Sequence, residues 1–226
     1  MRIEKRRIVV DEYTTVSSVW AIPQSFRLRE TDALILAHGA GTDMNDPMLS
    51  YVHESLARRG LFTVKFNFPY KEQGKKAPDM AAKLERAFRA VWLRVRDDER
   101  FQPRRLFIGG KSMGGRIASH LAAQGGEFAG LIFLGYPLHP PNQPKKIRSA
   151  HLGEISCPML FISGSRDPFC QLSLLEQVLK PLKAPTSVCI IKGGNHSFRI
   201  PKQSGQSQEN VWQEIVKVIS GWIQRI

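Results

Sequence analysis

Short apolar runs alternate with longer amphipathic stretches along almost the whole chain. Several of the runs are continuously apolar, which is typical of strands buried on both faces of a parallel sheet. The first two runs differ: they mix β-branched with polar residues and end at Pro23, so they predict two strands at one edge of the sheet. Eight strands are predicted, at residues 2–10, 14–22, 32–37, 62–66, 106–109, 131–135, 158–163 and 186–191.

The amphipathic stretches between these runs predict helices. In the stretch 79–96, apolar residues recur at helical spacing on one stripe, and the opposite face is basic. The segment 136–156 has neither an apolar strand run nor a helical apolar stripe, and it carries four prolines, so a stiff loop is predicted there. Helices are predicted at 47–59, 79–96, 171–180 and 208–226, and a further one begins just after Ser112.

This alternation predicts the α/β fold class, with an eight-stranded, mostly parallel sheet, helices on both faces and right-handed crossovers. A chain of 226 residues suits one well-buried domain, and no repeat or linker interrupts it, so 1–226 is expected to be a single domain. In such sheets, sites form at the carboxyl ends of the strands. The loops after the strands are therefore where chemistry is expected.

Composition and charge restrict the kinds of partner that the protein is expected to bind. The net charge is +13, but the basic residues are spread along the chain and do not interleave with aromatics, which favours a solvated surface over a nucleic-acid site. A nucleic-acid partner is unlikely on this pattern, although the charge alone keeps it open. No apolar run approaches the roughly 20 residues that span a bilayer. The three cysteines form no CxxC pair and no metal-ligand spacing, so we expect reduced thiols, a cytoplasmic location and no metal.

The most informative motif is Gly110-Lys111-Ser112-Met113-Gly114-Gly115, between a predicted strand and a predicted helix. A serine with glycines two residues away on each side, in this context, is the sequence form of a nucleophile elbow. Bulky residues at Gly110 or Gly114 are expected to collide with the neighbouring strand and helix. A phosphate-binding loop would need a glycine where Arg105 stands. A serine that only caps the helix is the remaining alternative.

Two further loops supply partners for Ser112. Asp167 follows the strand at 158–163, and His196 follows the strand at 186–191, which gives the order Ser, Asp, His. A serine hydroxyl needs an imidazole to take its proton and a carboxylate to orient that imidazole. Taken singly, Asp167 could cap the helix near Gln171, and His196 could be an ordinary loop histidine. Together they predict a catalytic triad.

Acyl transfer also needs two N–H donors for the developing oxyanion. The predicted donors are the backbone N–H groups of Met113 and Ala40. Ala40 lies in the loop His38-Gly39-Ala40-Gly41 after the third predicted strand, where Gly41 is the alternative donor. A simple turn is the other interpretation of this loop. His38 is expected to organise the loop.

Gly41, Lys111, Tyr136 and Arg148 are the predicted substrate-binding residues. Lys111 and Arg148, with Arg166, are expected to place positive charge near the mouth, which indicates an acidic or phosphate-bearing acyl substrate. Solvent exposure is the alternative role for each of these cations.

Over residues 31–225, these features resemble the α/β-hydrolase superfamily. The strings LILAHGAG, FNFPY, GGKSMGGRIAS, GYPLHPP, SGSRDPF and GGNHSF resemble a compact dienelactone-hydrolase-like branch. That branch includes testis-expressed-protein-30-like hydrolases and a related domain of a chromatin acetyltransferase complex. The resemblance implies a serine hydrolase without metal, organic cofactor or large helical lid domain. Ser112 stands where dienelactone hydrolases have cysteine, which argues against dienelactone cleavage itself.

Two functions follow as hypotheses. The first is a serine hydrolase that cleaves a carboxylic ester or thioester of a small molecule through an acyl-enzyme, away from any membrane. The second is a non-catalytic interaction module that binds an acidic or nucleic-acid partner through its basic surface. The complete set of Ser112, Asp167 and His196 favours the first, because a scaffold has no physical need for all three groups.

Overall fold

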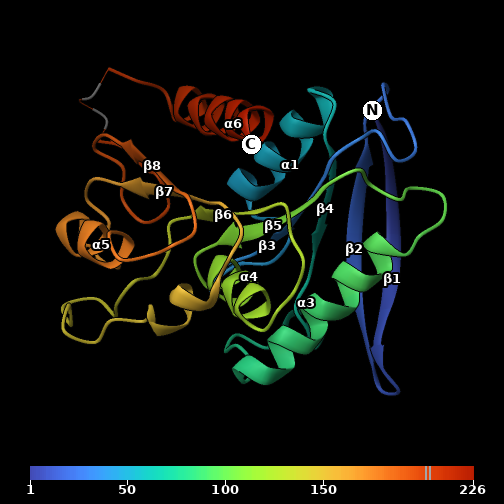
Figure 1. Cartoon of the computed structure of the whole chain (residues 1–226), viewed down its shortest axis with the longest axis horizontal. Helices are drawn as coiled ribbons and strands as arrows, with labels where there is room; N and C mark the ends of the chain where they lie inside the picture. Colours follow the sequence, from blue (N-terminus) through green and yellow to red (C-terminus); the bar gives the residue numbers. More distant parts are fainter. Residues whose placement is uncertain (202, 204) are drawn as a thin grey trace.

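The computed structural model describes residues 1–201, 203 and 205–226. Within these residues, eight strands form one sheet in the order β1-β2-β4-β3-β5-β6-β7-β8 (Figure 1). β1 pairs with β2 and β2 with β4 in antiparallel fashion, and every later pairing is parallel, which confirms the predicted fold class. The strands are β1 (Arg2–Asp11), β2 (Thr14–Ile22), β3 (Ala33–Ala37), β4 (Phe62–Phe66), β5 (Leu106–Lys111), β6 (Gly130–Leu134), β7 (Met159–Gly164) and β8 (Thr186–Ile191).

Helices cover both faces of the sheet, as the alternation predicts. The helices are α1 (Pro47–Arg58), α2 (Pro69–Glu72), α3 (Ala81–Arg96), α4 (Met113–Ala123), α5 (Leu172–Leu179) and α6 (Gln208–Arg225), with a 3-10 helix, η1 (Ala150–Glu154). α1 and α6 pack on one face, and α3, α4 and α5 pack on the other (Figure 1).

The central strands contribute side chains to two hydrophobic cores, one on each face of the sheet. In β3, Ala33, Ile35 and Ala37 face the α3 and α4 side, whereas Leu34 and Leu36 face α1 and α6. Side chains of a strand alternate between faces, so a strand covered on both sides must be apolar at every position. This is why β3 lacks the polar alternation of the outer strands.

Two short helices lie where loops were predicted. α2 is a single turn that begins at Pro69, and η1 lies inside the segment 136–156, where Leu152 is fully buried. Helices this short do not contain enough turns for an apolar period to emerge from the sequence. No helical domain is inserted above the carboxyl edge of the sheet in the part of the chain that the structure describes.

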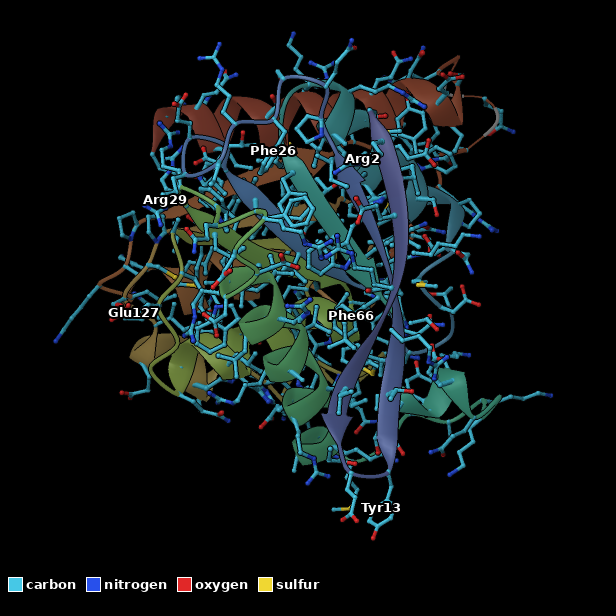
Figure 2. The ribbon with its side chains drawn as sticks, turned by 90° about the vertical axis from the view of Figure 1, so that its right-hand side faces the viewer. Arg2, Tyr13, Phe26, Arg29, Phe66 and Glu127 are labelled. Atoms are coloured by element: carbon cyan, nitrogen blue, oxygen red, sulfur yellow. The ribbon has the colours of Figure 1, made fainter. Side chains whose placement is uncertain are left out.

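The β1–β2 hairpin forms the outer edge of the sheet, with Tyr13 at its tip (Figure 2). Tyr13 is 89% exposed, whereas Trp20 near the other end of the hairpin is completely buried. The described residues contain no helix long and apolar enough to cross a membrane.

Candidate active site

Ser112 occupies the sharp turn between β5 and α4. Its backbone has φ 51° and ψ −117°, a conformation that costs free energy for any residue other than glycine and that clusters at functional sites. A Cβ at Gly110 would lie 2.2 Å from the carbonyl oxygen of Ala37, and one at Gly114 would lie 2.4 Å from the same atom. The predicted collision with a strand is therefore confirmed. The nearest atoms in both cases belong to Ala37 or His38 at the end of β3, and not to a helix as expected.

The loops after β7 and β8 bring two side chains to Ser112. His196 Nε2 lies 2.8 Å from Ser112 Oγ, and His196 Nδ1 lies 2.8 Å from Asp167 Oδ2. With Nδ1–H donating to the carboxylate, Nε2 is left to accept the serine proton. The Asp167 side chain is fully buried and also accepts a hydrogen bond from the N–H of Phe169 at 2.8 Å.

These contacts decide between the alternatives left open for single residues. Ser112 stands at the N-cap of α4, but its hydroxyl makes no capping hydrogen bond. Asp167 does not cap α5, whose N-cap is Gln171. His196 is held between the other two side chains, so the structure brings all three predicted residues together.

Backbone packing holds the two partner loops in place. A Cβ at Gly164 would lie 2.3 Å from the carbonyl oxygen of Gly194, so the end of β7 and the loop after β8 are in direct contact. Ser165 Oγ accepts a hydrogen bond from the N–H of Gly193 at 2.8 Å. The ring of Phe169 lies 4.3 Å from that of His196, centroid to centroid. Sequence reasoning missed these residues, since their role appears only when distant loops meet.

The loop after β3 is organised by two buried side chains. His38 Nδ1–H donates to the carbonyl of Gly39 at 2.8 Å, and His38 Nε2 accepts from the N–H of Phe68 at 3.0 Å. Burial lowers the pKa of His38 to about 4, which keeps the ring neutral and able to accept. The hydroxyl of Tyr70 donates to the carbonyl of Ala40 at 2.9 Å. The organising role expected for His38 is what the structure shows, and Tyr70 adds a second anchor.

The predicted oxyanion donors lie on this loop and on the first residue of α4. Within the described residues, no protein acceptor takes the backbone N–H of Ala40 or that of Met113. A Cβ at Gly39 would lie 3.6 Å from the Cβ of Ser112, so the loop passes directly beside the serine. Both N–H groups are thus available next to the hydroxyl. Gly41, the alternative, is exposed and has open space around it.

The structure corrects the expected position of Lys111. Its ammonium forms a buried ion pair with Asp46 at 2.9 Å, and the two side chains are 9% and 5% exposed. Side-chain alternation along β5 sends Lys111 toward the α1 face, away from any mouth beside Ser112. Asp46 also caps α1 by accepting from the N–H of Leu49, so the pair fastens that helix to the strand that carries the nucleophile.

Tyr136 and Arg148, two of the predicted substrate-binding residues, are joined by a hydrogen bond. The Tyr136 side chain is buried, and its hydroxyl donates to the backbone carbonyl of Arg148 at 2.9 Å. Burial raises the pKa of Tyr136 to about 12, so it remains a neutral donor. The side chain of Arg148 is exposed. Tyr136 therefore positions the loop, and Arg148 is the member of the pair that can meet a ligand.

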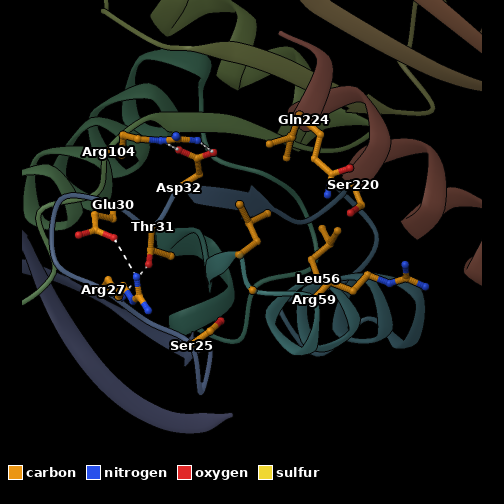
Figure 3. A pocket seen from close by; sticks show the side chains of 13 residues that line it. Ser25, Arg27, Glu30, Thr31, Asp32, Leu56, Arg59, Arg104, Ser220 and Gln224 are labelled. Atoms are coloured by element: carbon orange, nitrogen blue, oxygen red, sulfur yellow. Dashed lines mark hydrogen bonds and ion pairs between the residues drawn. The ribbon is translucent and has the colours of Figure 1, made fainter.

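Cavities lie both near the triad and far from it. A cavity of about 530 Å³ beside the loop after β7 is lined by Asp167, Pro168 and His139 among others. Another, of about 440 Å³, lies at the amino ends of the central strands, where Asp32 faces Arg104 (Figure 3). Its position at the opposite edge of the sheet separates it from Ser112. No three His, Cys, Asp or Glu side chains among the described residues are grouped to hold a metal ion.

Comparison with known proteins agrees with this geometry. A family model described as an alpha/beta hydrolase domain matches residues 30–224. The dienelactone hydrolase of Anabaena variabilis superposes with a TM-score of 0.78 at 19% identity, over 99% of this chain and 97% of that one. A serine hydrolase without a lid from Xanthomonas campestris gives 0.74 at 16% identity, over 99% and 94%. Est1E from Butyrivibrio proteoclasticus gives 0.75 at 14% identity, over 98% of both chains. At these identities the three likenesses establish a shared fold.

Proposed function

We propose that this chain, which belongs to the alpha/beta hydrolase family, is a serine hydrolase that cleaves a carboxylic ester or thioester of a small substrate through an acyl-enzyme. The observation that carries the proposal is the continuous line of hydrogen bonds from Asp167 through His196 to Ser112 Oγ, with 2.8 Å at each step. A nucleophile, a base and an orienting carboxylate in this order are the parts that acyl transfer requires.

The geometry supports a two-stage reaction. Ser112 Oγ attacks the carbonyl carbon while His196 Nε2 takes its proton, and the buried carboxylate of Asp167 stabilises the resulting imidazolium. The N–H groups of Met113 and Ala40 receive the negative oxygen of the tetrahedral intermediate. Collapse of that intermediate breaks the bond to the alcohol or thiol, which leaves with the proton of His196. Water, deprotonated by His196, then attacks the acyl-enzyme and releases the acid and Ser112.

The segment that follows β6 leaves Ser112 without a large helical lid. The segment 136–156 contributes loop and the short η1 in place of a large helical domain. Access to the serine then does not depend on the movement of a lid, and activity is not expected to rise at a lipid–water interface.

The proposal is tested by labelling and turnover together. The wild type should react with a fluorophosphonate probe and hydrolyse p-nitrophenyl acetate or butyrate, and Ser112→Ala should abolish both, because no other serine that the structure describes has an imidazole aligned with a buried carboxylate. Ser173→Ala, at an exposed serine near the same edge of the sheet, is the matched control and should behave as wild type.

An unlabelled wild type that hydrolyses neither ester would contradict the proposal. The interaction module would then be the better hypothesis, and salt-dependent retention on DNA would test its basic surface directly.

A further inference from the structure

Arg116 is a half-buried cation next to the nucleophile. Its backbone N–H donates to the carbonyl of Ser112 at 3.1 Å, so it lies one turn along α4 from the serine. Its Nε–H points to His120 Nε2 at 3.5 Å, a weak contact in which the acceptor is not a carboxylate. No carboxylate among the described residues lies within ion-pair distance of its guanidinium.

The acid on the other side of His120 already has other hydrogen-bond partners. Glu85 of α3 accepts from His120 Nδ1 through Oε1 at 2.7 Å and from the side-chain amide of Gln124 through Oε2 at 3.0 Å. The His120 ring therefore stands between Glu85 and Arg116. A guanidinium that is partly removed from water and lacks a direct counter-charge is unfavourable, and an anionic ligand would relieve that cost.

Arg148 adds a second cation beside the first. Ser119 of α4 and Tyr136 both contact His151 Nε2, at 2.7 and 3.4 Å, and Tyr136 also bonds the backbone of Arg148, so residues 148–151 are fastened against α4. Burial and, to a smaller extent, the charge of Arg148 lower the pKa of Arg116. No ion pair in the described part of the chain neutralises Arg148.

The two arginines lie along a strip that begins at Ser112. α4 lies between α3 on one side and η1 on the other (Figure 1). Met113, Arg116 and His120, spaced three and four residues apart, form the face of α4 that is not fully buried between these two neighbours. The backbone of Arg116 lies one helical turn, about 5.4 Å, along α4 from Ser112, so an acyl chain on Ser112 could extend along this strip toward the guanidinium.

We infer that Arg116 and Arg148 bind an anionic oxygen group, carboxylate or phosphate, at the far end of the acyl chain. The substrates would then be monoesters of short-chain dicarboxylic or phosphate-bearing acids. Guanidinium groups suit this task because they donate two parallel hydrogen bonds to a carboxylate or a phosphate. The substrate class rests on the proposed function, whereas the anion site does not.

Calorimetry tests the anion site without turnover. Adipate or inorganic phosphate should bind the wild type, dimethyl adipate, which carries no carboxylate, should bind more weakly than adipate, and Arg116→Gln should weaken anion binding by about tenfold or more, the scale of a lost charge-assisted hydrogen bond. Arg116→Lys should recover part of the loss. Lys146→Gln removes an exposed charge from the same loop and should bind as wild type. Which of the two anions binds more tightly distinguishes a carboxylate from a phosphate substrate.

Wild type that binds neither anion, or Arg116→Gln that binds both as tightly as wild type, would overturn the inference. If Arg116→Gln does not fold, Arg148→Gln, which changes an exposed side chain, replaces it: anion binding as tight as that of the wild type would again overturn the inference.

Turnover tests the substrate class. Mono-4-nitrophenyl adipate should exceed its methyl-capped counterpart in kcat/KM, and Arg116→Gln should remove that preference while the methyl-capped ester is still cleaved. Equal rates for the two esters in the wild type would contradict the class and leave the proposed function intact. Failure to cleave either ester would count against the proposed function, and calorimetry would still decide the anion site.

Discussion

Gly135 controls the position of His196 although the two residues are 61 positions apart in the sequence. It follows β6 with φ +70°, and a Cβ there would lie 3.1 Å from the carbonyl oxygen of His196 and 3.4 Å from Nδ1, the atom that bonds Asp167. A methyl group would push the imidazole away from its partners. We therefore expect Gly135→Ala to lower kcat/KM for p-nitrophenyl butyrate by roughly ten- to a hundredfold, since small misplacements of a catalytic group cost this much.

The variant Gly125→Ala distinguishes the effect of the contact between Gly135 and His196 from the effect of backbone strain. Gly125 has a similar φ of +86°, but a Cβ there would meet nothing within 4 Å. Both variants should lose about 1 kcal/mol of stability from the left-handed backbone, whereas only Gly135→Ala should lose activity. Equal activity in the two variants would show that Gly135 has no role in positioning His196.

At the scale of elements, one buried carboxylate fastens the outer strand to a helix. The Asp98 side chain, just after α3, is 3% exposed and forms ion pairs with Arg6 of β1 at 2.9 Å, Arg94 at 3.3 Å and Arg100 at 3.0 Å. The guanidinium of Arg6 also lies 4.0 Å from the ring centre of Trp20. β1 pairs with only one strand, β2, so this cluster gives it a second attachment, to the end of α3.

Asp98→Asn should destabilise the protein by about 2 to 3 kcal/mol, because it leaves Arg6 buried with a weaker partner. Burial opposes the ionisation of Asp98, but the hydrogen bonds and charges of Arg100 and Arg94 outweigh it, so its pKa is lowered below the usual 3.8. A lowered carboxyl pKa stabilises the fold above pH 3.8, and the stabilisation is lost as the pH falls through the folded value. Urea unfolding at pH 7 and at pH 3 should show a smaller difference in the free energy of unfolding between variant and wild type at pH 3 than at pH 7.

Asp97→Asn is the control for that prediction. Asp97 is adjacent, but its side chain is 58% exposed and pairs only with the half-exposed Arg96. Exposed ion pairs contribute about 0 to 1 kcal/mol, so this variant should unfold close to wild type. If Asp97→Asn proved as damaging as Asp98→Asn, general surface charge rather than the buried cluster would hold β1.

The elements that sequence predicted well share a strong periodic signal. The strand predicted at 62–66 matches β4 to the residue, and the stripe over 79–96 matches α3, because each has enough residues to show a period. Lys111 shows the opposite case. Its place next to Ser112 in sequence suggested a place next to it in space, but alternation along β5 turns it to the other face, where it meets Asp46.

At the scale of the molecule, the order Ser112, Asp167, His196 could be predicted because the fold aligns the carboxyl ends of parallel strands at one edge. The groups that position them could not. Gly135, Tyr70 and Phe169 act through contacts with residues distant in the chain, and nothing in their local sequence marks those contacts. Strand order is likewise a property of the assembled sheet, because which strands become neighbours is decided by packing rather than by any single segment.

Three histidines, two fully buried (His38 and His53) and one partly buried (His151), give the whole molecule a predicted sensitivity to acid. Burial lowers the pKa of His38 to about 4, that of His53 to about 3 and that of His151 to about 4, from the usual 6.5. Below pH 6.5 the unfolded chain therefore binds protons that the folded protein does not, and stability must fall as the pH falls from 6.5 toward 4. Each such histidine contributes on the order of 1.4 kcal/mol per pH unit within that window.

His53→Leu tests this account at a side chain far from the triad. His53 is fully buried in α1, and neither ring nitrogen has a partner among the described residues, so leucine removes a titrating group without breaking a hydrogen bond. The free energy of unfolding in urea, measured between pH 7 and 4.5, should fall less steeply in the variant, by about one proton or roughly 1.4 kcal/mol per pH unit. The slope of the free energy of unfolding against urea concentration should not change, because the same surface is exposed on unfolding. An unaltered pH slope would mean that His53 is hydrated or protonated in the native state, and that acid destabilises this fold through other groups.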